Sequence, residues 1–319
     1  MHKKRKRVAY IRIISLLFII ILIAGIYKIN SVFWPYFINR LTRDNIKSLD
    51  SEYQNTLPLD FEELYSPHAI LIRLNDHKVI YKNNDDEKIY PASLTKIMTA
   101  IVAIENIPNL EEMIILPEKL FTDLYTANAT MAGFLPGEEV TALDLLYGTL
   151  LPSGADASLG LAIRISGSES EFVKLMNKKA KELGMEDTHF VNVTGLHDSN
   201  HYTTVRDIAM LLQYALKNET FRNIFTTTRH STDFTNLHPG GITFYSTLFK
   251  KTNTYEFDGG KIIGGKTGYT DESGLCLASL AEKGKYEYIL VTAGAKGNQY
   301  TEQFHVMDAF TVYENFVKD

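Results

Sequence analysis

Ser93 and Lys96, three residues apart, form the pair in this sequence best suited to nucleophilic chemistry. The apolar spacing of the following residues predicts a helix over about 93–105. Residues i and i+3 share a helix face, so the amine of Lys96 can reach the Ser93 hydroxyl. A neutral lysine amine can take the proton of a serine and make its oxygen a nucleophile. A Ser-x-x-Lys spacing occurs by chance roughly once in a chain of this length, so the interpretation needs other motifs.

Two later segments carry groups that could complete such a site. The loop 153–156 presents the hydroxyl of Ser153 at the start of a predicted helix, where a serine by itself most simply acts as an N-cap. The segment 264–270 places Lys266 and Thr267 between glycines, in or beside a predicted strand. Glycine lets a substrate backbone approach closely, while the lysine supplies positive charge and the threonine donates a hydrogen bond.

The elements that must position these residues follow an α+β pattern. A hairpin begins the domain, helices fill its middle and a sheet is completed near its end. This order predicts a helical cluster packed on an antiparallel β-sheet. We predict helices at 141–150, 155–166, 169–183, 204–216 and 308–316, and strands at 68–74, 78–81, 226–229, 260–264, 274–281 and 286–293.

The N-terminus carries a basic cluster followed by an apolar run over 13–27. With 8–12 this run approaches the ~20 residues that span a bilayer, and we interpret it as one uncleaved transmembrane helix. A cleaved signal peptide is the alternative, although the residues around Ala24 form a poor cleavage site. The positive-inside rule then predicts a single-pass membrane protein with a cytoplasmic N-terminus and the domain outside the cytoplasm.

Composition narrows the possible functions further. With 45% hydrophobic and 22% charged residues, the chain is typical of a globular protein. The net charge of −5 gives the domain no electrostatic case for binding nucleic acid. The single cysteine, Cys276, cannot form an intrachain disulfide and is expected in the core. We predict a basic tail and anchor at 1–30, a stalk at 31–60 and one domain at 61–319.

Three short motifs occur in order along the chain: Ser93-Leu94-Thr95-Lys96, Ser153-Gly154-Ala155 and Lys266-Thr267-Gly268. In this order they resemble the motifs of penicillin-binding proteins and serine β-lactamases. Further segments resemble the low-molecular-mass penicillin-binding proteins that are serine-type D-alanyl-D-alanine carboxypeptidases, peptidase family S11. These segments are 91–99, 176–180, 183–185, 192–197, 201–204 and 264–270. The resemblance extends over roughly 66–316.

The resemblance implies a β-lactamase/transpeptidase-like fold with the site between the helical cluster and the sheet. It implies a D,D-peptidase whose substrate is a peptidoglycan stem peptide ending in D-Ala-D-Ala, and β-lactams as covalent inhibitors. Ser93 would form the acyl-enzyme, Lys96 would be its base, and Ser153 would relay a proton to the leaving amine. No metal or other cofactor is expected.

The third motif would bind the substrate. Lys266 and Thr267 would hold its terminal carboxylate, and Gly268 would let its backbone approach. The backbone N–H groups of Ser93 and Tyr269 would form the oxyanion hole. We also expect partial burial and the nearby charge of Lys266 to lower the pKa of Lys96, so that its amine is neutral.

Two departures from the family pattern stand out. The family usually has asparagine where Ala155 stands, and losing that amide could cost about 1–3 kcal/mol of transition-state binding unless Asp156 substitutes for it. Some members also have an arginine where the stretch 294–302 offers only Lys296. Because the chain ends soon after Phe316, we expect no further β-rich domain. We therefore expect the N-terminal segment to be the only membrane attachment.

Three alternatives stay open at this point. A catalytically weak penicillin-binding or scaffold protein of the same fold would explain Ala155. A serine β-lactamase would need a deacylating glutamate, and nothing between Ser166 and His201 resembles one. A zinc peptidase could use His197 and His201, but there is no His-Glu-x-x-His motif, and polar loop residues are the better interpretation.

Overall fold

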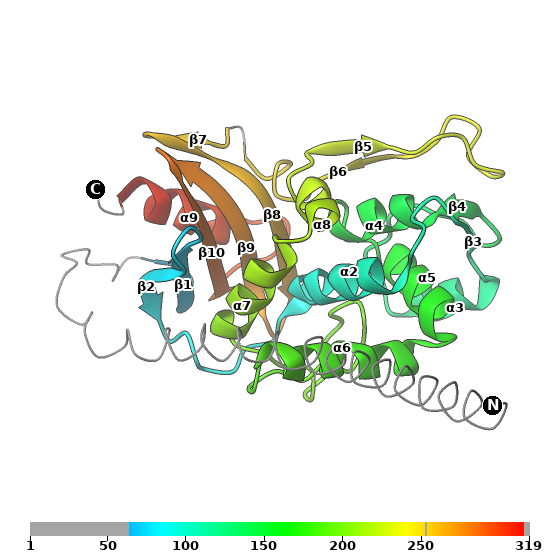
Figure 1. The fold of residues 1–319 in the computed structure, drawn as a ribbon, viewed down its shortest axis with the longest axis horizontal. Coiled ribbons are helices and arrows are strands. Elements are labelled where there is room, and N and C mark those ends of the chain that lie inside the picture. The colour runs from blue at the N-terminus through cyan, green and yellow to red at the C-terminus, as the bar shows by residue number, and fades with distance from the viewer. Residues whose placement is uncertain (1–63, 253, 316–319) are drawn as a thin grey trace, which may run out of the picture. The chain divides into compact units, whose positions relative to one another are not determined.

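The main sheet carries one side of the predicted site. Its strands come from the beginning and the end of the domain's sequence (Figure 1). The computed structural model describes residues 64–252 and 254–315, so the predicted anchor and stalk lie outside the described residues. Within 64–252 and 254–315, no helix is long and apolar enough to cross a membrane.

Six antiparallel strands form the main sheet, in the order β2-β1-β10-β9-β8-β7. Two short two-stranded sheets, β3–β4 and β5–β6, lie outside it. The strands are β1 His68–Arg73, β2 Lys78–Asn83, β3 Met113–Ile115, β4 Glu139–Thr141, β5 Arg229–Ser231, β6 Thr243–Tyr245, β7 Glu256–Phe257, β8 Gly260–Thr270, β9 Gly274–Lys283 and β10 Tyr286–Ala295.

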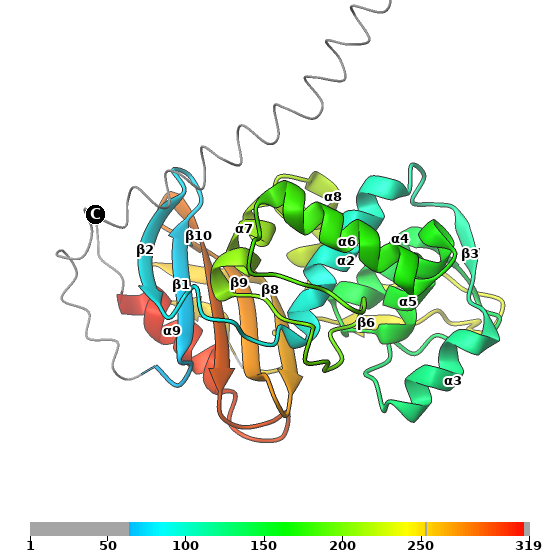
Figure 2. The ribbon, with the colours of Figure 1, turned by 90° about the horizontal axis from the view of Figure 1, so that it is seen from below.

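The helices form a cluster on one face of this sheet, except for the last helix, α9, on the opposite face (Figure 2). They are the 3-10 turn η1 Ala92–Leu94 and the helices α2 Thr95–Asn106, α3 Glu118–Thr126, α4 Ala142–Leu150, α5 Ala155–Ser166, α6 Glu169–Leu183, α7 Val205–Ala215, α8 Glu219–Phe225 and α9 Phe304–Asn315.

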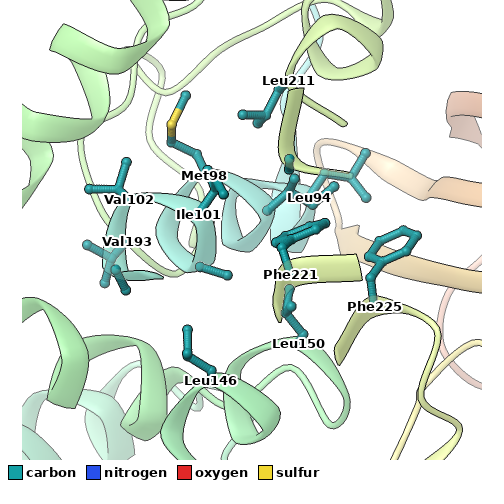
Figure 3. Close-up of a cluster of buried hydrophobic side chains, with 14 of the residues drawn as sticks. Leu94, Met98, Ile101, Val102, Leu146, Leu150, Val193, Leu211, Phe221 and Phe225 are labelled. Carbon is teal, nitrogen blue, oxygen red and sulfur yellow. The ribbon is translucent and has the colours of Figure 1, made fainter. Parts of the chain in front are cut away.

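The helix α2 runs through the centre of the helical cluster. Nine of its residues are buried, including the polar Lys96 and Thr99. Figure 3 shows Met98, Ile101 and Val102 among apolar side chains from α4, α7, α8 and the loop at Val193. Because α2 is packed on several sides, the position of its first turn is fixed by the core.

Alternating side chains of the sheet serve two cores. In β9, Cys276 and Ala278 face the helical cluster, while Leu277 contributes to a smaller core with α9 residues such as Val312 and Tyr313. This period-2 alternation is what a sheet covered on both faces requires. The buried position of Cys276 confirms its predicted place in the core.

Most predicted elements are confirmed within a few residues, but one strand is wrong. The threonine-rich stretch 226–229 ends α8 instead, and only Arg229 of it joins a strand, β5. The hydroxyl of Thr226 donates to the carbonyl of Arg222, and that of Thr227 to the carbonyl of Asn223. β-branched residues favour strands, but these hydroxyls satisfy the last turn of a helix.

The strand β8 is longer than predicted and carries the third motif. The predicted strand over 260–264 continues through Gly264 and Gly265 to Thr270, with a register shift against β9 between Ile262 and Gly264. A Cβ on Gly264 would lie 2.7 Å from the carbonyl oxygen of Phe225, so the glycine allows α8 to pack directly on the strand.

Candidate active site

Ser93 lies in the 3-10 turn that leads into α2, and Lys96 follows in the first turn of that helix. The Nζ of Lys96 is 3.2 Å from the Oγ of Ser93, as the i,i+3 spacing predicts. Ala92, the residue before the serine, has a left-handed φ of +45°. Left-handed backbone is costly for residues other than glycine, and such strain collects at functional sites.

The amine of Lys96 is held in a dry environment. Its side chain is 2% exposed, and besides Ser93 it donates a hydrogen bond to the backbone carbonyl of Thr194 at 2.5 Å. Burial lowers the pKa of Lys96 from 10.5 to about 7, and the charge of Asp156 acts in the opposite direction. The predicted direction of the shift is therefore confirmed, but its main cause is complete burial, and Lys266 is not among its causes.

The loop 192–196 closes the site over Lys96. The side-chain oxygen of Asn192 accepts hydrogen bonds from the backbone N–H groups of Thr194 and Gly195, which shapes a tight turn. A Cβ on Gly195 would lie 1.8 Å from the carbonyl oxygen of Ala92, so only glycine fits there. This contact places the Thr194 carbonyl against the amine of Lys96.

A second lysine and serine pair lies opposite the first. The buried Nζ of Lys266, on β8, donates to the Oγ of Ser153 at 2.9 Å and to its neighbouring carbonyl, that of Thr267, at 2.8 Å. Burial lowers the pKa of Lys266 well below 10.5, and the charge of Lys96 lowers it further. The charged form of Lys96 thus disfavours a charge on Lys266.

The motif taken alone suggested that Ser153 is the N-cap of α5, but it is not. Gly154 occupies the N-cap position, and Ser153 has a left-handed φ of +70° in the turn before it. A Cβ on Gly154 would lie 2.5 Å from that of Ala132, which explains the glycine. The strained backbone leaves the Ser153 hydroxyl free to meet Lys266.

The strand β8 packs directly on the turn that carries the nucleophile. A Cβ on Gly268 would lie 3.1 Å from the backbone nitrogen of Ser93. One residue earlier, the hydroxyl of Thr267 donates to that of Thr247 at 2.7 Å. The third motif therefore lies directly against the turn of the first motif.

The middle motif offers no side-chain amide. Ala155 is 1% exposed, and its backbone N–H donates to the carbonyl of Thr130. The suggestion that Asp156 substitutes for the missing asparagine is wrong, because its carboxylate is fully buried. It accepts hydrogen bonds from the backbone N–H groups of Ala132, Gly133 and Phe134.

His201 has a structural role rather than a metal-binding one. Its Nδ1 accepts the backbone N–H of Val191, so Nε2 carries the proton and lies 2.8 Å from the hydroxyl of Thr95. That hydroxyl in turn donates to the carbonyl of Ala92. Burial lowers the pKa of His201 to about 4. Both ring nitrogens are used, and residues 64–252 and 254–315 contain no group of three or more potential metal ligands.

The structure brings the predicted residues of the three motifs together from four elements, η1, α2, β8 and the loop before α5. Their chemical roles stay predictions. Sequence reasoning missed Thr194, whose carbonyl holds the base, and Thr247, which contacts Thr267. Thr194 was quoted within a family motif, but the sequence carries no signal for the role of a backbone carbonyl.

Several known proteins are similar to this chain in sequence and in fold. The family model of D-alanyl-D-alanine carboxypeptidases, peptidase family S11, matches residues 54–297. The D-alanyl-D-alanine carboxypeptidase DacF of Bacillus subtilis (strain 168) is 40% identical over 236 residues, which cover 71% of this chain and 57% of that protein. A D-alanyl-D-alanine carboxypeptidase of Streptomyces sp. (strain K15) is 34% identical over 213 residues, covering 64% of this chain and 72% of its own.

A solved structure agrees with the sequence comparisons. The crystal structure of the Streptomyces K15 DD-transpeptidase has a TM-score of 0.70 and 26% sequence identity, and the match covers 81% of this chain and 97% of that one. The fold is therefore that of the penicillin-binding peptidases, with its helical cluster and antiparallel sheet. The chain spans only 57% of the length of the Bacillus protein.

Proposed function

We propose, for a chain that belongs to the D-alanyl-D-alanine carboxypeptidase family, peptidase family S11, that it removes the terminal D-alanine from peptidoglycan stem peptides. The observation that carries this proposal is the Ser93–Lys96 pair, because it joins a partly exposed hydroxyl to an amine whose pKa is about 7. Such an amine is half neutral near pH 7 and can act as a general base.

Acylation starts when Lys96 takes the proton of the Ser93 hydroxyl. The carbonyl of Thr194 accepts one N–H of the amine, which leaves the lone pair directed toward the serine. The oxygen of Ser93 attacks the carbonyl carbon of the penultimate D-alanine. The backbone N–H groups of Ser93 and Tyr269 then stabilise the oxyanion.

The opposite pair of residues handles the leaving group and the carboxylate. Ser153 donates a proton to the departing amine of the last D-alanine and regains one from Lys266. Lys266 in turn takes up the proton that Lys96 removed from Ser93, so that Lys96 is neutral again before hydrolysis. Lys266 and Thr267 hold the terminal carboxylate, whose negative charge raises the pKa of Lys266 and restores its positive charge. Breaking the peptide bond releases D-alanine and leaves an ester on Ser93.

Hydrolysis of this ester completes the reaction. With D-alanine gone, Lys96 takes a proton from a water molecule that attacks the ester carbonyl. The proton returns to the oxygen of Ser93 as the C–O bond breaks. A β-lactam follows the first half of this path and stays attached, because its leaving group is tethered and blocks the approach of water.

The test is release of D-alanine from a pentapeptide ending in D-Ala-D-Ala, together with labelling by a fluorescent penicillin. The wild-type chain should do both, and Ser93→Ala should abolish both. Ser231→Ala, which changes an exposed serine of β5, is the matched control and should behave as wild type. If the wild-type chain shows no labelling and releases no D-alanine, the enzymatic function is contradicted.

A second candidate is a catalytically weak penicillin-binding or scaffold protein of the same fold. The buried methyl of Ala155 and the engaged carboxylate of Asp156 favour it, because neither can orient the substrate backbone. Penicillin labelling of Ser93 without release of D-alanine from any stem peptide would select this candidate over the carboxypeptidase.

We also propose that the chain is attached to the cell membrane by its N-terminal segment, with the peptidase domain outside the cytoplasm. The basic cluster and the apolar run 13–27 support this placement. Mass spectrometry of the protein from membranes should give the uncleaved chain. A mature chain beginning after Ala24 would contradict an anchor.

A further inference from the structure

The peptide group that joins Ala92 to Ser93 carries one of the two N–H groups that the proposed reaction uses for its oxyanion. The two ends of this peptide face different parts of the molecule. A Cβ on Gly195 would lie 1.8 Å from the carbonyl oxygen of Ala92, so the carbonyl faces the loop 192–196. A Cβ on Gly268 would lie 3.1 Å from the backbone nitrogen of Ser93, so the N–H end faces β8. Because a trans peptide is planar, the direction of its carbonyl also fixes the direction of its N–H.

A series of three hydrogen bonds ends on that carbonyl. The backbone N–H of Val191 donates to Nδ1 of His201 at 3.1 Å, which leaves the ring proton on Nε2. Nε2 lies 2.8 Å from the hydroxyl oxygen of Thr95, and this hydroxyl donates to the carbonyl of Ala92 at 2.8 Å. Since the hydroxyl has a single proton and gives it to Ala92, its oxygen accepts from His201. Each group in the series therefore has one fixed direction.

The series is shielded from water. Thr95 and His201 are both buried, and burial lowers the pKa of His201 to about 4. The ring is therefore neutral at the pH where Lys96 is half neutral, and Nδ1 keeps its role as acceptor. In a dry interior, hydrogen bonds linked in series polarise one another. A donor on the Ala92 carbonyl thus strengthens the N–H at the other end of the same peptide as a donor.

The backbone before Ser93 needs such a restraint. Ala92 has a left-handed φ of +45°, which is costly for a residue other than glycine. Strained backbone of this kind persists only where surrounding contacts hold it. Without the hydrogen bond from Thr95, the turn would relax by rotating this peptide, and the N–H of Ser93 would turn away from its present direction.

We propose that His201 is a positioning residue for the reaction. Through Thr95 it holds and polarises the peptide between Ala92 and Ser93, and so directs the N–H of Ser93 at the oxyanion. Its effect is largest in the transition state, where the carbonyl oxygen of the substrate gains negative charge. The inference rests on the proposed function and deepens it by naming the group that prepares its oxyanion hole.

The first test removes the Thr95 hydroxyl but keeps the shape of the side chain. Losing a whole oxyanion donor costs about 10²–10³-fold in kcat, and a misdirected donor should cost less. Thr95→Val should therefore lower kcat on a pentapeptide ending in D-Ala-D-Ala by about 30-fold and change KM by less than about threefold. Thr95→Ser, which keeps the hydroxyl, should retain most of the activity.

Thr203→Val is the matched control for this test. Thr203 is also buried, and its hydroxyl forms a hydrogen bond with that of Thr188 at 2.7 Å, away from the Ala92 carbonyl. The control should lose stability in urea unfolding as Thr95→Val does, but keep the wild-type kcat. An unchanged kcat in Thr95→Val, or an equal fall in the control, would overturn the inference.

Variants of His201 test the next member of the series. His201→Leu removes both ring nitrogens and should lower kcat by about tenfold, less than Thr95→Val because the Thr95 hydroxyl remains. His201→Gln should recover most of this loss, since its amide oxygen can accept from Val191 and its amide nitrogen can donate to Thr95. Equal losses in the two variants would reduce the ring to a packing role and overturn the inference.

The ester that a penicillin forms on Ser93 gives a readout that a loss of stability does not move. Donors in the oxyanion hole polarise the ester carbonyl and lower its stretching frequency, which infrared difference spectra of an isotope-labelled penicillin isolate. The band should move to higher frequency in Thr95→Val and His201→Leu, and stay in place in Thr203→Val.

This spectrum also separates the inference from the proposed function. If the wild type releases no D-alanine but the band moves as expected in the variants, the proposed function fails and the inference stands. If D-alanine is released and the band does not move, the inference alone is overturned. A wild-type chain that forms no ester with penicillin would overturn both.

Discussion

The two sides of the site, the turn that carries Ser93 and the turn that carries Ser153, are built alike but equipped differently. Each begins with a residue of left-handed backbone, Ala92 and Ser153, and each places a serine hydroxyl against a buried lysine amine. On the α2 side both reacting groups come from one helical turn. On the α5 side the lysine comes from a distant strand, and Ala155, two residues after Ser153, presents only a methyl.

This difference separates chemistry from substrate orientation. The α2 side carries the proposed nucleophile and base, held by the Thr194 carbonyl and the core around α2. The α5 side uses its acidic residue, Asp156, to hold the backbone of 132–134 and has no side-chain amide at position 155. We infer that the chain has kept its nucleophile and changed how it holds the substrate.

The largest effect should come from the α2 side. Lys96→Met removes the base and replaces it with a side chain of similar length. General-base catalysis contributes about 10²–10⁴-fold, so release of D-alanine should fall by about a thousandfold. The measurement is kcat/KM on a pentapeptide, with the exposed Lys174→Met as control. A loss below about tenfold would show that another group takes the proton.

The α5 side should respond through stability. Asp156→Ala leaves three backbone N–H groups of a buried loop without their acceptor, which should lower the free energy of unfolding by about 3 kcal/mol. Thermal or urea unfolding gives this value, and Glu171→Ala, which changes an exposed carboxylate in the first turn of α6, is a milder comparison. An unchanged stability with lost activity would instead give Asp156 a direct role in catalysis.

The pH dependence of the reaction should follow Lys96. Because its neutral form is the base and its pKa is about 7, kcat/KM should rise tenfold per pH unit up to about pH 7 and then level off. The unfolded chain holds this proton up to about pH 10.5, so the free energy of unfolding should rise with pH between about 7 and 10.5. Lys96→Met should remove this contribution to stability. If the rise of kcat/KM below pH 7 persists in Lys96→Met, the assignment of that rise to Lys96 is contradicted.

The smallest effect should come from Ala155→Asn. The new amide restores a group able to hold the substrate backbone, but it must fit where a methyl is 1% exposed. We expect kcat/KM to change by about threefold to tenfold and the preference among stem peptides to shift, with overpacking limiting the gain. Ala155→Ser is a smaller polar control. Identical rates on every peptide tested would make Ala155 incidental to substrate binding.

The sequence predicted the α2 side better than the α5 side for a physical reason. A helical spacing of three residues fixes the distance between Ser93 and Lys96 wherever the helix lies. The direction of Asp156 depends on the loop 132–134, more than twenty residues away, and no local pattern records it. The stretch 226–229 shows the same limit. Its threonines favour a strand, but in the folded chain their hydroxyls donate to carbonyls of the last turn of α8.

The sequence by itself therefore determined the fold class, the order of the elements and the residues of the three motifs. These follow from periodicity, turn chemistry and short spacings, all of which act locally. The tertiary structure alone decided that Lys96 is buried enough to be half neutral near pH 7 and that Lys266 meets Ser153. Burial and long-range approach depend on the whole packed chain, and so only the folded protein defines them.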